Sequence, residues 1–233
     1  MLSLFDLLDA GTLGMDLAAY LMARISRGAS FMVGAAPGGA GKTTVMCALL
    51  NLAPADVILV PATAEGVRRA LEAQEGGPGR CYVCHEIGAG RYYAYLWNQS
   101  LREYCSLAQQ GHMLATNLHA DDIEQARYQV CSENHVPVED FRRFGVLLFM
   151  SVCGGWFDAK RRIETVWSTD GTCDHVLVYD RHSGLRRDVA NSVDGRYVKR
   201  CRRFIEQSYT RGVRTIEQTR EAAVRFLDAT VVP

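Results

Sequence analysis

A glycine-rich segment that joins an apolar run to a helical pattern constrains the fold of this chain more than any other feature. The apolar run covers residues 29–35, the segment 36–44 holds three glycines, and a helical pattern extends over 42–52. A buried strand that turns directly into a helix is the first part of a strand–helix–strand unit, which builds a parallel sheet. The sequence therefore predicts an α/β fold.

The rest of the chain first repeats this alternation and then departs from it. Further strands are expected at residues 56–61, 80–87 and 112–118, and further helices at 13–25, 65–75 and 91–109. Helices between strands predict a mostly parallel sheet flanked by helices on both faces. The last β-rich runs, at 145–154, 161–169 and 174–184, are closely spaced and broken by Asp-Gly and Ser-Gly turns. They predict a meander that finishes the sheet.

The composition is that of one globular domain with a helical appendage. Of the 233 residues 48% are hydrophobic and 22% charged, and 26 basic residues balance 26 acidic ones, so no overall charge favours nucleic acid or an anionic membrane. The longest apolar stretch is too short to span a bilayer and the first residues carry acids, which predicts a cytoplasmic protein. We expect an N-terminal helical segment at 1–28, a core at 29–191, and a basic amphipathic helical tail at 192–233, broken at Gly212.

The glycine-rich segment has the spacing of a Walker A phosphate-binding loop, with Ala36 in place of the usual first glycine. Backbone amides in such a loop converge on phosphate at the positive end of the helix. Lys42, one of three lysines in the chain, would contact the β- and γ-phosphates, and the Thr43 hydroxyl would ligate Mg²⁺. The predicted nucleotide-binding residues are Pro37, Gly38, Gly39, Ala40, Gly41, Lys42, Thr43 and Thr44. A flexible glycine-rich turn is the alternative.

A carboxylate for hydrolysis is expected at the end of a strand beside the loop strand. Glu86 stands at the end of the apolar run that begins at Arg80, and a glycine-rich turn follows it. This position suits a residue at the carboxyl edge of a parallel sheet, where ligands bind. An exposed acid at a strand end is the alternative for Glu86. Asp121 and Asp122 are interpreted as candidates for the start of a helix.

Two histidines complete an order of motifs that resembles a known superfamily. His112 follows Gly111, a strand comes next, and His119 stands in a Leu-His-Ala sequence. The order of Walker A loop, strand-end glutamate and histidine pair resembles the secretion ATPase superfamily, the hexameric motors of type II and type IV secretion and of type IV pili. The resemblance implies a RecA-like P-loop fold, Mg²⁺-dependent ATP hydrolysis, and a homo-oligomeric ring at the inner face of a secretion or pilus membrane assembly.

The resemblance also implies roles for single residues. Lys42 and Thr43 match the Walker A pair, and Glu86 matches the Walker B glutamate, which acts in catalysis and on Mg²⁺ directly or through a water. His112 and His119 match the histidine box that senses the γ-phosphate, and His119 would take part in catalysis. An imidazole can hydrogen-bond a phosphate oxygen whether neutral or protonated. Structural histidines at a strand edge are the alternative for both.

The sequence departs from the superfamily at three places. Pro61 and Ala62 stand where the superfamily has an acidic pair, and Glu65 is the nearest acid. No arginine finger is evident after Glu86, so we expect a neighbouring subunit to supply one. About 28 residues precede the core, so the superfamily's N-terminal domain is expected to be absent. An ATP-hydrolysing motor is the leading hypothesis, and a nucleotide-dependent switch with little or no turnover is the alternative. A P-loop kinase is the third hypothesis, and it is less favoured because no lid segment rich in arginines is evident.

Other local patterns are interpreted as structural. Cys81, Cys84 and His85 spell the haem c attachment motif and half of a zinc site, but strand alternation would send the two thiols to opposite faces. Neither haem nor zinc is therefore expected. Tyr92 and Tyr95 are expected to pack in the core rather than stack on nucleic-acid bases.

Overall fold

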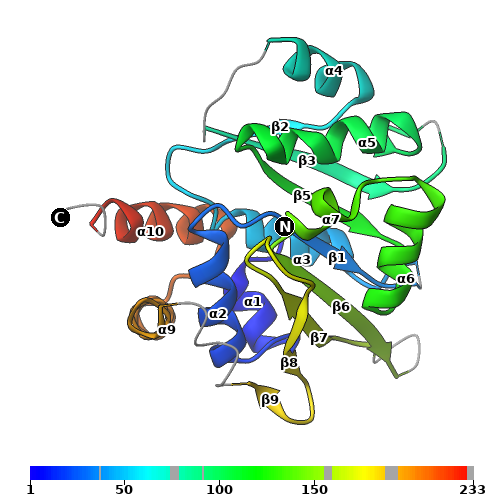
Figure 1. Cartoon of the computed structure of the whole chain (residues 1–233). Helices are drawn as coiled ribbons and strands as arrows, with labels where there is room; N and C mark the ends of the chain where they lie inside the picture. The colour runs from blue at the N-terminus through cyan, green and yellow to red at the C-terminus, as the bar shows by residue number, and fades with distance from the viewer. Residues whose placement is uncertain (37, 74–78, 91, 155–158, 187–193, 230–233) are drawn as a thin grey trace.

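The computed structural model describes residues 1–36, 38–73, 79–90, 92–154, 159–186 and 194–229. Within these residues nine strands form one sheet, with helices on both faces (Figure 1). The strands are β1 (Phe31–Gly34), β2 (Ile58–Pro61), β3 (Arg80–Ile87), β4 (Tyr95–Leu96), β5 (Met113–Leu118), β6 (Val146–Cys153), β7 (Lys160–Ser168), β8 (Val176–Asp180) and β9 (Gly184–Leu185). The helices are α1 (Leu4–Asp9), α2 (Met15–Ile25), α3 (Lys42–Leu50), α4 (Ala64–Ala73), α5 (Gln99–Ser106), the 3-10 helix η1 (Leu107–Gln110), α6 (Ile123–Arg127), the π-helix η2 (Tyr128–Glu133), α7 (Val138–Arg142), α9 (Gly195–Thr210) and α10 (Ile216–Asp228).

The strand before the glycine-rich loop has a parallel neighbour on each side. The order across the sheet is β2-β3-β5-β1-β6-β7-β8-β9, with β4 beside β3. β1 pairs in parallel with β5 and β6, and the strands from β6 to β9 form the predicted antiparallel meander. One strand, β5, therefore separates the loop strand from β3, which carries Glu86. This arrangement confirms the expected RecA-like α/β fold.

Side chains of the central strands alternate between two buried clusters. Phe31 and Val33 of β1 pack in one cluster with α1, α2, α3 and α9, while Met32 packs in the other with α4, α5 and α7. Burial on both faces explains why these strands have continuous apolar sequences. Cys81 lies in the first cluster and Cys84 in the second, so the predicted placement of the two thiols on opposite faces is confirmed.

The two C-terminal helices pack on the domain. α9 lies against α2, and Tyr197 and Ile205 are buried in the same cluster as the P-loop helix α3. From α10, Arg220 donates hydrogen bonds to backbone carbonyls in the segment 51–55, which follows α3. Gly212, with a φ of +79°, lies between the two helices at the predicted break. The three-segment division at 28 and 191 remains a prediction.

The prediction of a helix at 91–109 is wrong for the first half of this range. β4 pairs with β3 there, and α5 begins only at Gln99. Ala94 and Asn98 have φ values of +55° and +51°, and a right-handed helix contains no positive φ values. Tyr92, which was expected in the core, is 72% exposed, and Tyr95 is only partly buried. Pairing with β3 therefore overrides the local helical pattern.

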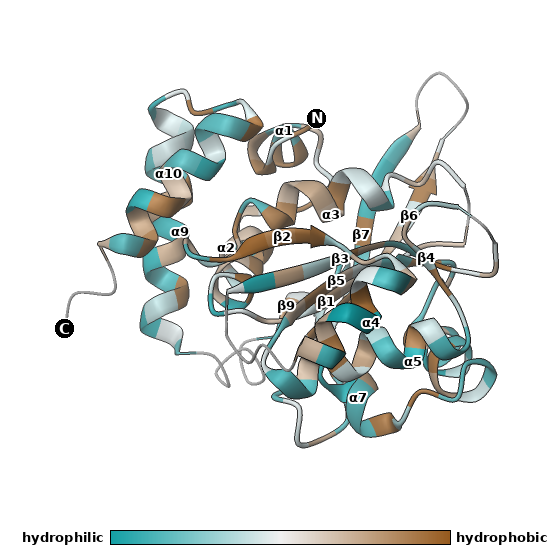
Figure 2. Ribbon diagram, turned by 90° about the horizontal axis from the view of Figure 1, so that it is seen from above, coloured by the Kyte–Doolittle hydropathy of each residue, from teal (hydrophilic) through white to brown (hydrophobic). Residues whose placement is uncertain are grey.

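β2 forms one edge of the sheet and leaves apolar side chains in solvent. Ile58 and Leu59 are 64% and 49% exposed. Figure 2 shows this strand in the brown of apolar residues. Leu59 also lines an apolar groove with Tyr92 and Tyr93. No helix in the described part of the chain is long and apolar enough to cross a membrane.

Gly34, the last residue of β1, has no room for a side chain. A Cβ atom there would lie 2.6 Å from the carbonyl oxygen of Ala120 and 2.7 Å from the ring of Phe149. Gly34→Ala is therefore expected to lower the free energy of unfolding by about 1–3 kcal/mol, measured by urea denaturation. Gly195→Ala is the control, because a Cβ at the start of α9 meets no atom within 4 Å. Equal stability of the two variants would contradict this packing argument.

Candidate phosphate-binding site

The glycine-rich loop connects β1 to α3 and lines a cavity of about 650 Å³. Gly39 and Gly41 have φ values of +76° and +89°, a left-handed conformation that favours glycine, and Gly41 is the N-cap of α3. The loop residues that line the cavity are Gly38, Gly39, Ala40, Gly41, Lys42, Thr43 and Thr44. Pro37, which was also predicted to bind nucleotide, lies outside the described residues.

Lys42 and Glu86 form a buried ion pair beside the loop. Each side chain is 8% exposed, and Lys42 Nζ lies 3.6 Å from Glu86 Oε1. Nζ also donates a hydrogen bond of 3.1 Å to the carbonyl of Ala35, just after β1. Burial lowers the pKa of the Lys42 ammonium below its usual range, and the Glu86 carboxylate opposes that shift. The structure thus brings together the lysine and the carboxylate that the sequence analysis singled out separately.

A β-bulge lies at Glu86. Cys84 pairs with Thr116 and Ile87 with Leu118, so β3 has one more residue than β5 between these two pairs. Bulges bend a strand and redirect its side chains, and they are frequent next to active sites. The Glu86 Oε1 atom is buried and has no hydrogen-bond partner among the described residues. A buried carboxylate oxygen of this kind can accept a hydrogen bond from a water molecule or a ligand.

His119, directly after β5, lies beside the same ion pair. Its Nε2 atom is 3.7 Å from Glu86 Oε2, and its Nδ1 atom is 3.2 Å from Lys42 Nζ and 3.1 Å from the carbonyl of Ala36. A ring nitrogen either donates or accepts, so the two contacts of Nδ1 are alternatives set by the tautomer. The side chain is 49% exposed, which leaves it accessible from the cavity.

Two further polar residues hold the loop in place. Asn117 is fully buried, and its Nδ2 donates 2.8 Å to a backbone carbonyl of β3 and 3.4 Å to Thr43 Oγ1. Asp121 Oδ1 accepts a hydrogen bond of 2.7 Å from the amide of Ala36, where the loop begins. Only Asp122 caps α6, so the expectation of a helix-start role is confirmed for that residue. The sequence analysis missed Asn117 and the loop contact of Asp121.

The structure does not bring His112 to the cavity. His112 precedes β5 and His119 follows it, and a strand of this length separates its two ends by roughly 20 Å. His112 is 5% exposed and packs edge-on against Tyr82, with ring centroids 5.2 Å apart. The extended strand therefore places the two predicted sensing histidines at opposite ends of β5. We assign no phosphate contact to His112.

Comparisons with known proteins give distant structural matches. No family model matches the chain, and no curated protein matches it by sequence. Similar solved structures are the VirB11 ATPase of the Brucella suis type IV secretion system in complex with sulfate (20% identity, TM-score 0.46), and the DotB ATPases of Yersinia pseudotuberculosis (11%, 0.49) and Legionella pneumophila (10%, 0.47). All three are ATPases. The matches cover 70%, 94% and 93% of this chain and 54%, 62% and 58% of those chains, so this chain spans less than two thirds of their length. The candidate site rests on the geometry of this chain alone.

The donor set beside the loop fits Mg²⁺. The Thr43 hydroxyl and the Glu86 carboxylate both line the cavity, and Mg²⁺ prefers oxygen ligands. The Glu86 Oε1 atom, which accepts no hydrogen bond from the described residues, supports this fit. Among the described residues no group of three or more His, Cys, Asp or Glu could hold a metal. Mg²⁺ takes one or two protein ligands and completes its shell with phosphate and water.

The opposite wall of the cavity comes from β7 and the N-terminal segment. Arg161 on β7 donates from Nε to the carbonyl of Gly39 at 3.0 Å. The Thr12 carbonyl accepts a hydrogen bond of 2.9 Å from the amide of Ile163, which attaches the N-terminal segment to β7. The remaining residues of this wall are Leu2, Leu7, Ala10, Met150, Ala159 and Lys160. The sequence analysis missed this wall, because no local pattern links positions so far apart in the chain.

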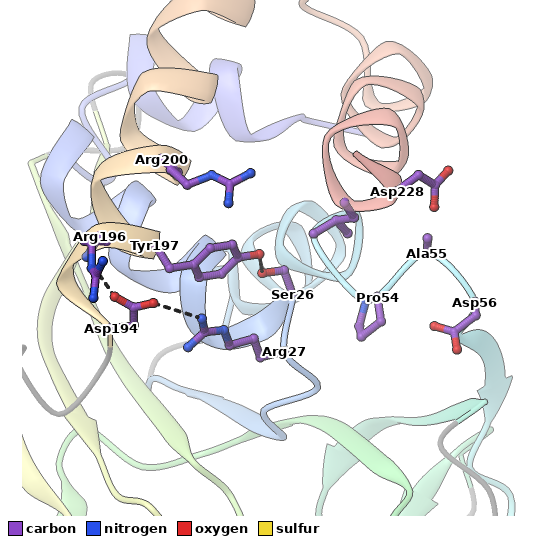
Figure 3. A pocket seen from close by; sticks show the side chains of 11 residues that line it. Ser26, Arg27, Pro54, Ala55, Asp56, Asp194, Arg196, Tyr197, Arg200 and Asp228 are labelled. Carbon is purple, nitrogen blue, oxygen red and sulfur yellow. Dashed lines mark hydrogen bonds and ion pairs between the residues drawn. The ribbon is translucent and has the colours of Figure 1, made fainter. Parts of the chain in front are cut away.

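A second cavity, of about 870 Å³, lies away from the loop among α2, α9 and α10 (Figure 3). Arg27 pairs with Asp194 at 3.6 Å and stacks on the ring of Tyr197, whose hydroxyl is 2.9 Å from Ser26 Oγ. The charged residues that line it are Arg27, Arg196, Arg200, Asp56, Asp194 and Asp228. Three arginines face three aspartates, so the charge of this cavity selects no charged ligand.

Proposed function

We propose that the chain binds ATP with Mg²⁺ and hydrolyses it, as a motor of the secretion or pilus type that its motifs resemble. The observation that carries the proposal is the buried ion pair of Lys42 and Glu86 at the glycine-rich loop. Burying two charges costs free energy, which a turn with only a connecting role would not require. A lysine beside convergent backbone amides suits the β- and γ-phosphates, and the adjacent carboxylate suits the attacking water.

Each residue of the site would have a separate task in the proposed reaction. The loop amides and Lys42 would bind the phosphates, and Glu86 would accept a proton from the attacking water. His119 Nε2, which faces Glu86, would donate a hydrogen bond to the terminal phosphate and so respond to its presence. Thr43 and Glu86 would hold Mg²⁺, which when bound neutralises charge on the phosphates. Asn117 would keep the Thr43 hydroxyl in position.

A ring-shaped homo-oligomer that works on the cytoplasmic side of a membrane assembly belongs to the same proposal. The alternative is a nucleotide-dependent switch of the same fold with little or no turnover. One observation favours this alternative: Pro61, the last residue of β2, and Ala62 stand where the superfamily has an acidic pair. Glu65, the nearest acid, pairs with Arg69 on the exposed side of α4 and does not line the cavity.

ATP turnover measured against protein concentration, with the mass of the oligomer at each point, tests the proposal. A motor is expected to show turnover per chain that rises with concentration together with a ring-sized mass, because neighbouring subunits complete the site. A monomer that binds ATP and shows no turnover at any concentration would support the switch. Absence of ATP binding would contradict both.

A further inference from the structure

The cavity at the loop has two chemically different walls. The wall from β3 and β5 carries Glu86 and His119, which are proton acceptors or donors. The wall from β7 and the N-terminal segment carries Arg161 and the apolar side chain of Leu2, which is 48% exposed. β1, which leads into the loop, lies between β5 on one side and β6 and β7 on the other. The two walls therefore stand on opposite sides of the loop.

Arg161 contacts the loop through one of its N–H donors. Its Nε atom donates to the Gly39 carbonyl, and its Cδ atom lies 3.0 Å from the position of a Cβ on Gly41. Among the residues that the structure describes, no carboxylate pairs with Arg161 and neither terminal amino group has a hydrogen-bond partner. Arg142, in contrast, donates from two nitrogens to Asp174. Arg161 is thus held beside the phosphate-binding loop without a countercharge from the residues that the structure describes.

The position of Glu86 fixes the direction of a bound nucleotide. The attacked phosphate must lie at the Glu86 wall, because a general base acts within hydrogen-bond distance of the water that attacks. The α- and β-phosphates and the nucleoside then extend toward the wall of β7. The exposed apolar side chain of Leu2 suits the face of a base, and the planar fork of a guanidinium suits a pair of phosphate oxygens.

We infer that Arg161 binds the α- and β-phosphates of the nucleotide, from the side of the loop opposite to Glu86. The inference rests on the proposed function and adds to it a phosphate-binding arginine supplied by the same chain. The diphosphate lies between Lys42 and Arg161, so two positive groups neutralise it. The Nε hydrogen bond to Gly39 holds the guanidinium at this position while its terminal amino groups contact phosphate.

Calorimetric affinities for ADP and for a non-hydrolysable ATP analogue, both with Mg²⁺, test the inference. Arg161→Gln keeps an N–H donor for the Gly39 carbonyl but removes the charge, whereas Arg161→Lys keeps the charge. We expect Arg161→Gln to weaken both nucleotides about tenfold and equally, and Arg161→Lys to retain most of the affinity. The wild-type affinity should also fall more steeply with salt than that of Arg161→Gln. Arg162→Ala is the matched control, because side chains alternate along β7 and Arg162 does not line the cavity.

Each other outcome has a distinct meaning. A loss for the ATP analogue alone would place Arg161 at the terminal phosphate and overturn the inference. Unchanged affinity in Arg161→Gln would show that only the contact with the loop matters. An equal loss in Arg161→Lys would show that the positive charge of Arg161 does not bind the phosphates. Either result would overturn the inference as well. Failure of the wild-type protein and of Arg162→Ala to bind either nucleotide would instead overturn the proposed function.

Discussion

Replacing Lys42 by alanine is expected to weaken the binding of ATP with Mg²⁺ roughly 10- to 100-fold. The variant loses a charge-assisted contact with the β- and γ-phosphates, worth about 1.5–3 kcal/mol. Isothermal calorimetry measures the change. Lys199→Ala is the control, because Lys199 is an exposed lysine of α9 that does not line the cavity. Unchanged affinity in Lys42→Ala would contradict the assignment of the loop to nucleotide.

The buried partner of Lys42 requires a second variant. Lys42→Ala leaves the Glu86 carboxylate buried without its ammonium partner, which destabilises the folded state. The double variant with Glu86→Gln removes both charges. It is expected to unfold at a higher temperature than Lys42→Ala and to bind ATP no better. Recovery of affinity in the double variant would mean that the single variant fails through misfolding, and that Lys42 does not contact phosphate.

The strands of the core were predictable because burial on both faces leaves a strong sequence signal. β3 has the predicted bounds, and the predicted runs around β1, β5 and β6 differ from the structure by one or two residues at their ends. The loop was predictable for a different reason. The conformation of the loop depends on residues that are adjacent in the sequence. Gly39 and Gly41 have positive φ values, which favour glycine, so the glycines in the sequence indicate this conformation.

The helix expected at 91–109 shows where local pattern fails. Tyr92, Tyr95 and Leu96 fall at helical spacing, but β4 satisfies its backbone groups by pairing with β3. Tyr95 pairs with Glu86, only nine residues earlier, but the spacing of the apolar side chains does not show which backbone groups pair. The same limit applies to the bulge at Glu86, which arises from unequal residue numbers on β3 and β5 between two paired positions.

The candidate site also contains residues that local sequence predicts and residues that it does not. Lys42, Thr43 and Glu86 follow local motifs, and the sequence analysis named them. Arg161 reaches Gly39 across 122 residues of sequence, and nothing in the segment around Arg161 indicates that contact. The separation of His112 from His119 could be predicted from the sequence, because an extended strand that begins after one histidine and ends before the other cannot bring the two together.

Glu86→Gln is expected to lower ATP turnover about 100-fold or more while it leaves ATP affinity unchanged. Glutamine keeps the shape of the side chain but cannot accept a proton from the attacking water, so the loss falls on the chemical step rather than on binding. Steady-state turnover and calorimetric affinity, measured on the same preparation, separate the two effects. Glu65→Gln is the control, since Glu65 pairs with Arg69 on the exposed side of α4, and its turnover should stay at the wild-type level. If Glu86→Gln turned over ATP like the wild type and Glu65→Gln did not, the base would be Glu65, and the buried pair at Lys42 would serve binding alone.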